Sequence, residues 1–183
     1  MNLGEEYLAT ATRRLKYYKD LGDRTFAQLD KSDFYYKPSS ESNSIAVIIQ
    51  HLSGNMLSRW TNFLTEDGEK DSRDRDEEFE THDYSKDELL KLWSEGWDCF
   101  LGALDSLKPD DLLKTINIRN ESMTAIDAIS RQLAHYPYHI GQILYIGRIV
   151  KNDVWKNLSI PRGSSKLYNQ GDHVKDPAKN FSR

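Results

Sequence analysis

Two histidines four residues apart, His135 and His139, stand in the stretch HYPYHIGQ. Four residues advance about 400° around an α-helix, so both imidazoles would lie on one helical face and could bind one metal ion. No glutamate follows the first histidine, so the stretch is not the HExxH motif of zinc proteases. The pair alone is more typical of histidines that hydrogen-bond in a core or face solvent. Catalytic zinc sites usually have three protein ligands, so a metal site needs a further residue.

His51 is the candidate third ligand. It lies beside Ile48 and Leu52 at the border of an apolar helical face. Taken alone, a histidine in this position is also typical of a hydrogen-bonded core residue. Three histidines from two helices would leave positions open for water or substrate and would suit Zn²⁺, Ni²⁺ or Fe²⁺. His82, in a charged segment, and His173, in a polar tail, are weaker candidates.

Polar side chains also lie on the helical faces that carry the histidines. Asn55 follows His51 by one turn, and Gln142 follows His139. Amides at these positions could orient the metal ligands or contact the substrate, so Asn55 and Gln142 are candidate supporting residues. No residue stands out as a general base.

Four long segments with apolar residues every three or four positions must position these side chains. They predict helices over roughly 3–30, 44–65, 85–107 and 123–151, and thus an all-α fold in a single domain, 1–183, with a polar C-terminal tail. Ser42, Asn43 or Ser44 can cap the second helix, and Ser85 with Glu88 fits a capping box for the third. Residues 115–119, TINIR, alternate like a short strand.

The segment 66–83 between the second and third helices is strongly charged and has no apolar periodicity. Eighteen residues reach roughly 60 Å when extended, enough to cross the length of a bundle. The second and third helices are therefore predicted to run parallel, in a four-helix bundle with up-down-down-up order. A solvated loop is the simpler interpretation of the segment. The alternative is that 66–83 and the IPRG of 160–163 are ordered and shape the mouth of a pocket.

Composition and charge exclude several classes of protein. With 29 acidic and 25 basic residues the net charge is −4, which offers no basic surface for nucleic acid or an anionic membrane. The single cysteine, Cys99, cannot form an intrachain disulfide, and no apolar stretch resembles a signal peptide or a membrane span. We therefore expect a cytoplasmic protein whose partner is a small molecule.

Pro137 lies between the two histidines of the motif. Proline inside a helix removes a hydrogen bond and costs about 3 kcal/mol. The unbroken apolar pattern on both sides favours a kinked helix that aims His135 toward His51. The alternative is that a new helix starts at Pro137 and leaves His135 in a turn.

The stretches HLSGNMLSRW and HYPYHIGQ together resemble the DinB-like (YfiT-related) superfamily of metal-dependent four-helix bundles. The run from NSIAVIIQHLSGNMLSRW to RDRDEEF, with the late NLSIPRGSS, is similar to the DUF1572 branch of that superfamily. The resemblance spans most of the chain, to about residue 165. It implies a divalent metal held by His51, His135 and His139, and related bundles often look dimeric.

The resemblance also suggests a chemistry. Related proteins include S-transferases and isomerases that use low-molecular-weight thiols. Many relatives carry an arginine directly after the last histidine, where this chain has Ile140. If that arginine binds an anionic thiol, this chain must use another cation, and the candidates are Arg59, Arg131 and Arg148.

Two functions from different classes fit these residues. In the first, an enzyme, the ion binds a small thiol or water in an open position and lowers its pKa for transfer or hydrolysis. In the second, a non-catalytic module, the same triad holds a metal or small ligand without turnover. A cleft that reaches the metal favours the enzyme, whereas a closed site favours the module. In both, metal occupancy is expected to fall as the pH drops through about 6.5, where protons compete for imidazole.

Overall fold

The computed structural model describes residues 2–181, and the chain is mainly helical, as predicted, with one small sheet. The long helices are α1 (Leu3–Phe26), α3 (Ile45–Trp60), α4 (Lys86–Ser106) and α5 (Ala125–Lys151). The short helices are α2 (Lys31–Phe34), α6 (Ser165–Gln170) and the 3-10 turns η1 (Glu77–Phe79), η2 (Pro109–Asp111), η3 (Asn152–Val154) and η4 (Pro177–Phe181). The strands are β1 (Thr115–Ile118) and β2 (Glu121–Thr124).

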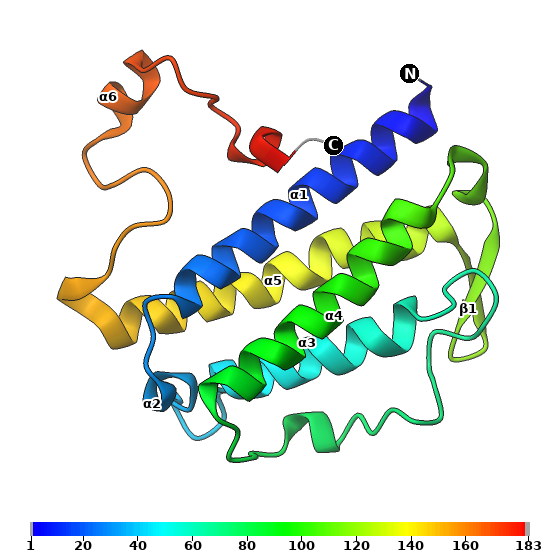
Figure 1. Ribbon diagram of the computed structural model, residues 1–183, viewed down its shortest axis with the longest axis horizontal. Helices are drawn as coiled ribbons and strands as arrows, with labels where there is room; N and C mark the ends of the chain where they lie inside the picture. The colour runs from blue at the N-terminus through cyan, green and yellow to red at the C-terminus, as the bar shows by residue number, and fades with distance from the viewer. Residues whose placement is uncertain (1, 182–183) are drawn as a thin grey trace.

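The long helices lie side by side (Figure 1). α3 and α4 run in the same direction and pack against each other, while α1 and α5 pack against each other and run the opposite way. The segment between α3 and α4 returns along the outside of α3, and η1 contacts that helix. This path places the charged segment beside the face of α3 that carries His51.

Side-chain caps begin the long helices where the sequence predicts helix starts. Ser44 caps α3 by accepting from the amide of Val47, and Ser85 forms the predicted capping box with Glu88 at α4. The predicted helix ends are less accurate. α1 stops at Phe26 rather than near residue 30, because the chain turns and the Asp33 carboxylate binds the Asp30 amide to start α2 (2.7 Å).

α3 also ends earlier than predicted, at Trp60 rather than near residue 65. Thr61 is extended, and Asn62 adopts a left-handed conformation (φ 51°), which asparagine tolerates better than most residues. The apolar pattern continues to Phe63 because that side chain still packs against Trp60, although it has left the helix. The apolar pattern in the sequence therefore extends beyond the last residue of the helix.

A β-hairpin precedes α5. The expected strand over 115–119 exists as Thr115–Ile118, but its antiparallel partner, residues 121–124, was not predicted, and it includes the two positions, 123 and 124, before the observed helix start. Arg119 and Asn120 form the two-residue turn, both with positive φ (59° and 61°). The Asp67 carboxylate accepts both turn amides at 2.9 Å, which ties the hairpin to the start of the 66–83 segment. Thr124 then caps α5, so the helix begins at Ala125.

The tail after α5 does not shape the candidate site. It crosses away from the long helices through α6 and returns to α1 at η4 (Figure 1). Residues 160–163 are exposed, and none of them lines the cavity at the triad, so the IPRG stretch does not form the mouth of that cavity. The expectation for the 66–83 segment is confirmed in part, because Arg73, Arg75 and Phe79 line a cavity described below.

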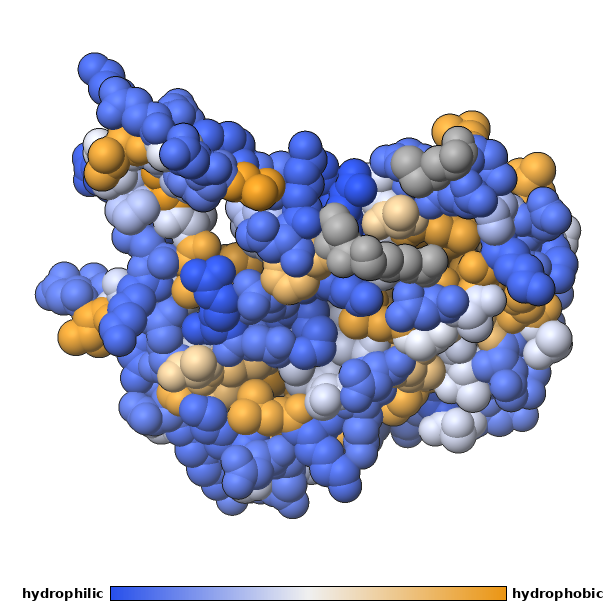
Figure 2. Space-filling view, turned by 45° about the horizontal axis from the view of Figure 1, so that its top comes forward, coloured by the Kyte–Doolittle hydropathy of each residue, from blue (hydrophilic) through white to orange (hydrophobic). Residues whose placement is uncertain are grey.

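Hydrophobic side chains on the face shown in Figure 2 form separate patches among hydrophilic ones. No helix in residues 2–181 has the length and apolar character that crossing a membrane requires.

Candidate metal centre

The three candidate histidines converge on one point between α3 and α5. The Nε2 atom of His135 lies 3.4 Å from that of His51 and 3.1 Å from that of His139. One ligand nitrogen from each ring lies within 4.8 Å of the other two. The three residues that the sequence nominates thus meet in space, although His51 and His135 are 84 positions apart in the chain.

α5 continues without a break through Pro137. His135 is therefore inside the helix, and the alternative that a new helix starts at the proline was wrong. His135 and His139 remain one turn apart on a single face, as their spacing predicts. Their rings lie 4.8 Å apart between centroids and nearly perpendicular, at 76°. Pro137 is itself half-buried.

Tyr136 anchors α5 against α3 and α4 at this level. Its ring is fully buried against Trp97 and Phe100. Its hydroxyl accepts a hydrogen bond from Trp60 Nε1 (3.0 Å) and donates one to Asn55 Oδ1 (3.1 Å). Burial raises the pKa of this hydroxyl, so it stays protonated and keeps donating. The contact fixes the register of α5 relative to α3, and with it the distance between the histidines.

Each histidine is held through its second ring nitrogen. The Nδ1 atoms face the side-chain oxygens of Glu78 (3.0 Å, from His51), Gln132 (3.1 Å, from His135) and Gln142 (3.1 Å, from His139). These oxygens accept, so each Nδ1 carries the proton and donates it. Each Nε2 is then left with a lone pair, and the three lone pairs point to a common centre.

This arrangement fits a bound cation. The Nε2 lone pair of His135 lies 3.4 Å from Nε2 of His51 and 3.1 Å from Nε2 of His139 without a proton between them, and a positive ion among the three rings would remove the resulting repulsion. Around a tetrahedral ion with bonds of about 2.0–2.1 Å, neighbouring nitrogens lie roughly 3.3–3.4 Å apart, and around an octahedral ion about 2.9 Å. The two separations from His135 Nε2, 3.1 and 3.4 Å, match this range, and the three ligand atoms all lie within 4.8 Å of one another. The three histidines could therefore hold a metal ion, and neutral imidazole is the form that coordinates one.

Burial favours the neutral form of two of the rings. Desolvation, with the neighbouring His139 and His51, lowers the pKa of His135 to about 3. Desolvation and His51 lower the pKa of His139 to about 4, against the opposing effect of the hydrogen bond that His139 donates to Gln142. At neutral pH both rings are uncharged and ready to coordinate. Proton competition at these two ligands consequently begins below the range near 6.5 that ordinary histidines predict.

Glu78 is the supporting residue that the sequence does not reveal. It is buried (8 % exposed) on the 66–83 segment, and its carboxylate also forms a two-point ion pair with Arg73 (2.7 and 2.9 Å). Burial raises the pKa of Glu78, but hydrogen bonds from His51 and Arg73 outweigh that effect, so the net pKa is lowered and the group is ionised. Phe79, next in the chain, lies against the His51 ring at 4.9 Å between centroids.

A glycine makes room for this carboxylate. Gly54 lies on α3 beside Glu78, and a Cβ at position 54 would collide with Glu78 Oε1. An acidic residue within a charged segment cannot be recognised from the sequence as a partner of a histidine, because many of its neighbours are also acidic. A glycine three positions after His51 inside an apolar helix is the only local sign that something approaches α3 closely.

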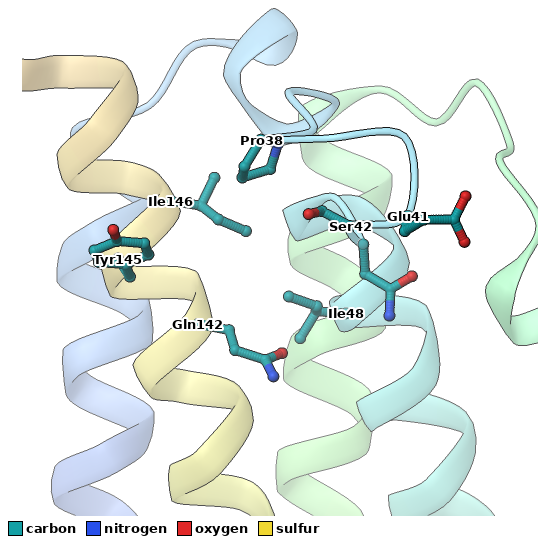
Figure 3. Close-up of a pocket in the computed structure, with 8 residues that line it drawn as sticks. Pro38, Glu41, Ser42, Ile48, Gln142, Tyr145 and Ile146 are labelled. Carbon is teal, nitrogen blue, oxygen red and sulfur yellow. The ribbon is translucent and has the colours of Figure 1, made fainter.

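The two predicted supporting amides have different partners. Gln142 accepts a hydrogen bond from His139 and also lines a second cavity of about 360 Å³ (Figure 3). Figure 3 shows Gln142 below Ile146 on its own helix, with its side chain directed toward Ile48 on α3. Asn55 accepts a hydrogen bond from Tyr136 rather than contacting a histidine, and it lines the cavity at the triad.

The triad opens into a cavity of about 360 Å³ between α3, α5, the 66–83 segment and the hairpin turn. Of the three candidate cations, Arg59 and Arg131 line this cavity and Arg148 does not. Ile140 is buried in the hydrophobic core, at 1 % exposed, so the side chain after His139 does not face the cavity.

The remaining histidines lie elsewhere, as predicted. His82 pairs with Glu77 (3.1 Å), and His173 packs against Tyr168 at 4.2 Å between ring centroids. Neither belongs to a group of potential metal ligands among residues 2–181.

Comparison with known proteins identifies the family and no function. A family model described as a protein of unknown function (DUF1572) matches residues 2–164. No curated protein and no solved structure matches the chain.

Proposed function

The chain belongs to the DUF1572 family, and we propose that it is a metal-dependent protein that holds a divalent transition metal through His51, His135 and His139. The observation that carries the proposal is the convergence of three Nε2 lone pairs, each fixed by an oxygen acceptor at Nδ1. Zn²⁺, Ni²⁺ and Fe²⁺ all suit an all-imidazole site.

We propose further that the site is catalytic. A metal bound here would supply Lewis acidity that lowers the pKa of a coordinated water or small thiol, for hydrolysis or for thiol transfer. The triad supplies three ligands from one side, and the cavity reaches it from the other. That opening favours an enzyme over a closed module that stores a metal.

The chain's own residues have separable tasks in this proposal. Glu78, Gln132 and Gln142 keep the rings in the tautomer that can coordinate. Burial keeps His135 and His139 unprotonated. Asn55 offers amide N–H groups to a ligand in the cavity, while Phe79 covers His51 and limits the access of water to its ring.

We also propose that the fold is that of the DinB-like superfamily, a four-helix bundle with up-down-down-up order. The supporting observations are the parallel α3 and α4, the long segment between them, and a histidine on α3 facing a pair on α5.

Cobalt substitution tests whether the site is open. Metal-free protein is loaded with Co²⁺, the visible spectrum is recorded, and a small thiol or azide is added. The proposal expects a spectrum of low coordination number that changes when the exogenous ligand binds, and a His135→Ala variant that gives neither signal. A cobalt spectrum that ignores added ligands would show a closed site and favour the non-catalytic module.

A further inference from the structure

Arginines surround the cavity that reaches the triad. They come from four parts of the fold: Arg59 on α3, Arg73 and Arg75 on the 66–83 segment, Arg119 in the hairpin turn and Arg131 on α5. None of the described residues that line the cavity is an aspartate or a glutamate. In a chain of net charge −4, this is a local concentration of positive charge.

Two of these arginines are neutralised by carboxylates behind the cavity wall. Arg73 pairs with Glu78 at 2.7 Å, and Arg119 pairs with Glu69 at 3.3 Å. Arg75 and Arg131 have no ion pair with any described residue, and both are exposed at the cavity. Excess positive charge therefore remains on the side that a ligand would enter.

Arg59 is the unusual member of the group. It is 5 % exposed, and its Nη1 is buried without a hydrogen-bond partner among the described residues. A buried guanidinium without a counter-ion is costly, because it has lost water and gained no acceptor. Burial, with the nearby Arg131 and Arg73, lowers its pKa to about 10, which still leaves it charged at neutral pH. An anion supplied by a ligand would remove this cost.

Helical spacing relates the arginines to the triad. On α3, His51, Asn55 and Arg59 follow one another at intervals of four residues and share a face. On α5, Arg131 precedes His135 by one turn. His51 and Arg59 are therefore about 12 Å apart along the helix axis. The histidines lie at one end of the cavity, and Arg59 with Arg131 lies at the other.

We infer that this cavity binds a small molecule carrying a carboxylate or phosphate group, with Arg59 and Arg131 as the principal partners of the anion. The inference rests on the proposed function in one respect: the far end of the same molecule meets the metal. Guanidinium groups bind both oxyanions through paired hydrogen bonds. A cavity of about 360 Å³ suits a small molecule rather than a polymer.

The neighbouring cavity in Figure 3 provides an internal contrast. It has the same volume of about 360 Å³, but its only charged lining residue among those described is Glu41. Anion binding is thus expected at one of the two cavities, and Arg148, on α5 outside the triad cavity, should take no part.

Anion titrations of metal-free protein test the inference. Protein dialysed against a chelator is titrated with inorganic phosphate and, separately, with malonate, at constant ionic strength set with sodium chloride, by calorimetry and by thermal shift. We expect saturable binding of at least one of the two, and the tighter one names the class of anion. Arg131→Gln and Arg59→Gln should each weaken it on the order of tenfold or more, and Arg148→Gln should leave it unchanged.

The design separates this inference from the proposed metal site. Metal uptake is measured on the same variants, so anion binding that depends on Arg131 in a protein without metal affinity supports the inference and contradicts the proposed function. Absence of saturable binding of either anion overturns the inference, whether or not metal binds. Binding that is equal in wild type and Arg131→Gln also overturns it. Arg131 is exposed, so this variant decides the question even if Arg59→Gln fails to fold.

Discussion

Glu78 Oε2 lies 3.0 Å from Nδ1 of His51, so a residue of the charged 66–83 segment fixes a candidate metal ligand on α3. The same carboxylate holds Arg73, whose side chain is only 4 % exposed. The segment is thereby attached to the site by a buried, ionised contact, although its composition alone is typical of a solvated loop.

Replacing Glu78 with glutamine should weaken metal binding by about 10–100-fold, the usual effect of losing a carboxylate behind a ligating histidine. The charge that orients His51 is lost, and Arg73 loses its closest ion pair, so the free energy of unfolding should fall by roughly 1–3 kcal/mol. Metal titration and urea unfolding measure both effects. Glu80→Gln, an exposed position two residues on, is the matched control. Wild-type metal affinity in Glu78→Gln would show that the contact is incidental.

Gly54→Ala should reproduce the loss of metal affinity without changing a polar group. The added Cβ collides with Glu78 Oε1 and must displace the carboxylate from His51. Gly102→Ala on α4 is the control, because a Cβ there meets nothing within 4 Å. That control should gain about 0.5–1 kcal/mol of stability from helix propensity alone and keep its metal affinity. A Gly54→Ala protein that binds metal like the wild type would disprove this account of position 54.

Acid should destabilise the metal-free protein through His135 and His139. Their folded-state pKa values, about 3 and about 4, lie below the ordinary value near 6.5. Between those values the unfolded chain binds more protons, so the free energy of unfolding falls as the pH drops below about 6.5. Urea unfolding with a chelator at pH 7, 6 and 5 should show a steeper loss for wild type than for the double variant His135→Gln, His139→Gln. Equal slopes would mean that these rings are not desolvated.

Metal should raise thermal stability by mass action. Ligands from α3 and α5 meet only in the folded chain, so free metal at about 100 times the dissociation constant should add about 2.7 kcal/mol to the free energy of unfolding. Differential scanning calorimetry with and without metal measures the shift, and a chelator should reverse it. A His51→Ala variant should show little shift. A shift of equal size in that variant would place the metal elsewhere.

The sequence predicts the parts of the site that lie on regular helices. The four-residue spacing of His135 and His139 survives in α5 because helical geometry alone decides it, and the apolar border at His51 places that residue on the inner face of α3. Glu78 could not be predicted, because its contact depends on the path of a segment without periodicity. The partner strand 121–124 was missed for a related reason: its pairing depends on a turn at Arg119 and Asn120 that Asp67 stabilises from a distance.

The arginines of the cavity also include some on helices and some on non-helical segments. The resemblance nominates Arg59, Arg131 and Arg148 together, as cations that could replace the arginine missing after His139. The structure separates them, because Arg59 and Arg131 line the triad cavity and Arg148 does not. Arg75 and Arg119 reach the cavity from non-helical segments, which only the folded chain brings together.

The metal content of untagged protein and its histidine variants tests the central claim most directly. The protein is purified without a histidine tag, dialysed, and analysed by inductively coupled plasma mass spectrometry, and the variants are then titrated with the metal that is found. We predict close to one divalent transition metal ion per chain, strongly weakened binding in His51→Ala, His135→Ala and His139→Ala, and unchanged binding in His82→Ala and His173→Ala. If each of the three single variants binds the ion as tightly as the wild type, the histidines are polar residues packed between two helices and not a metal site.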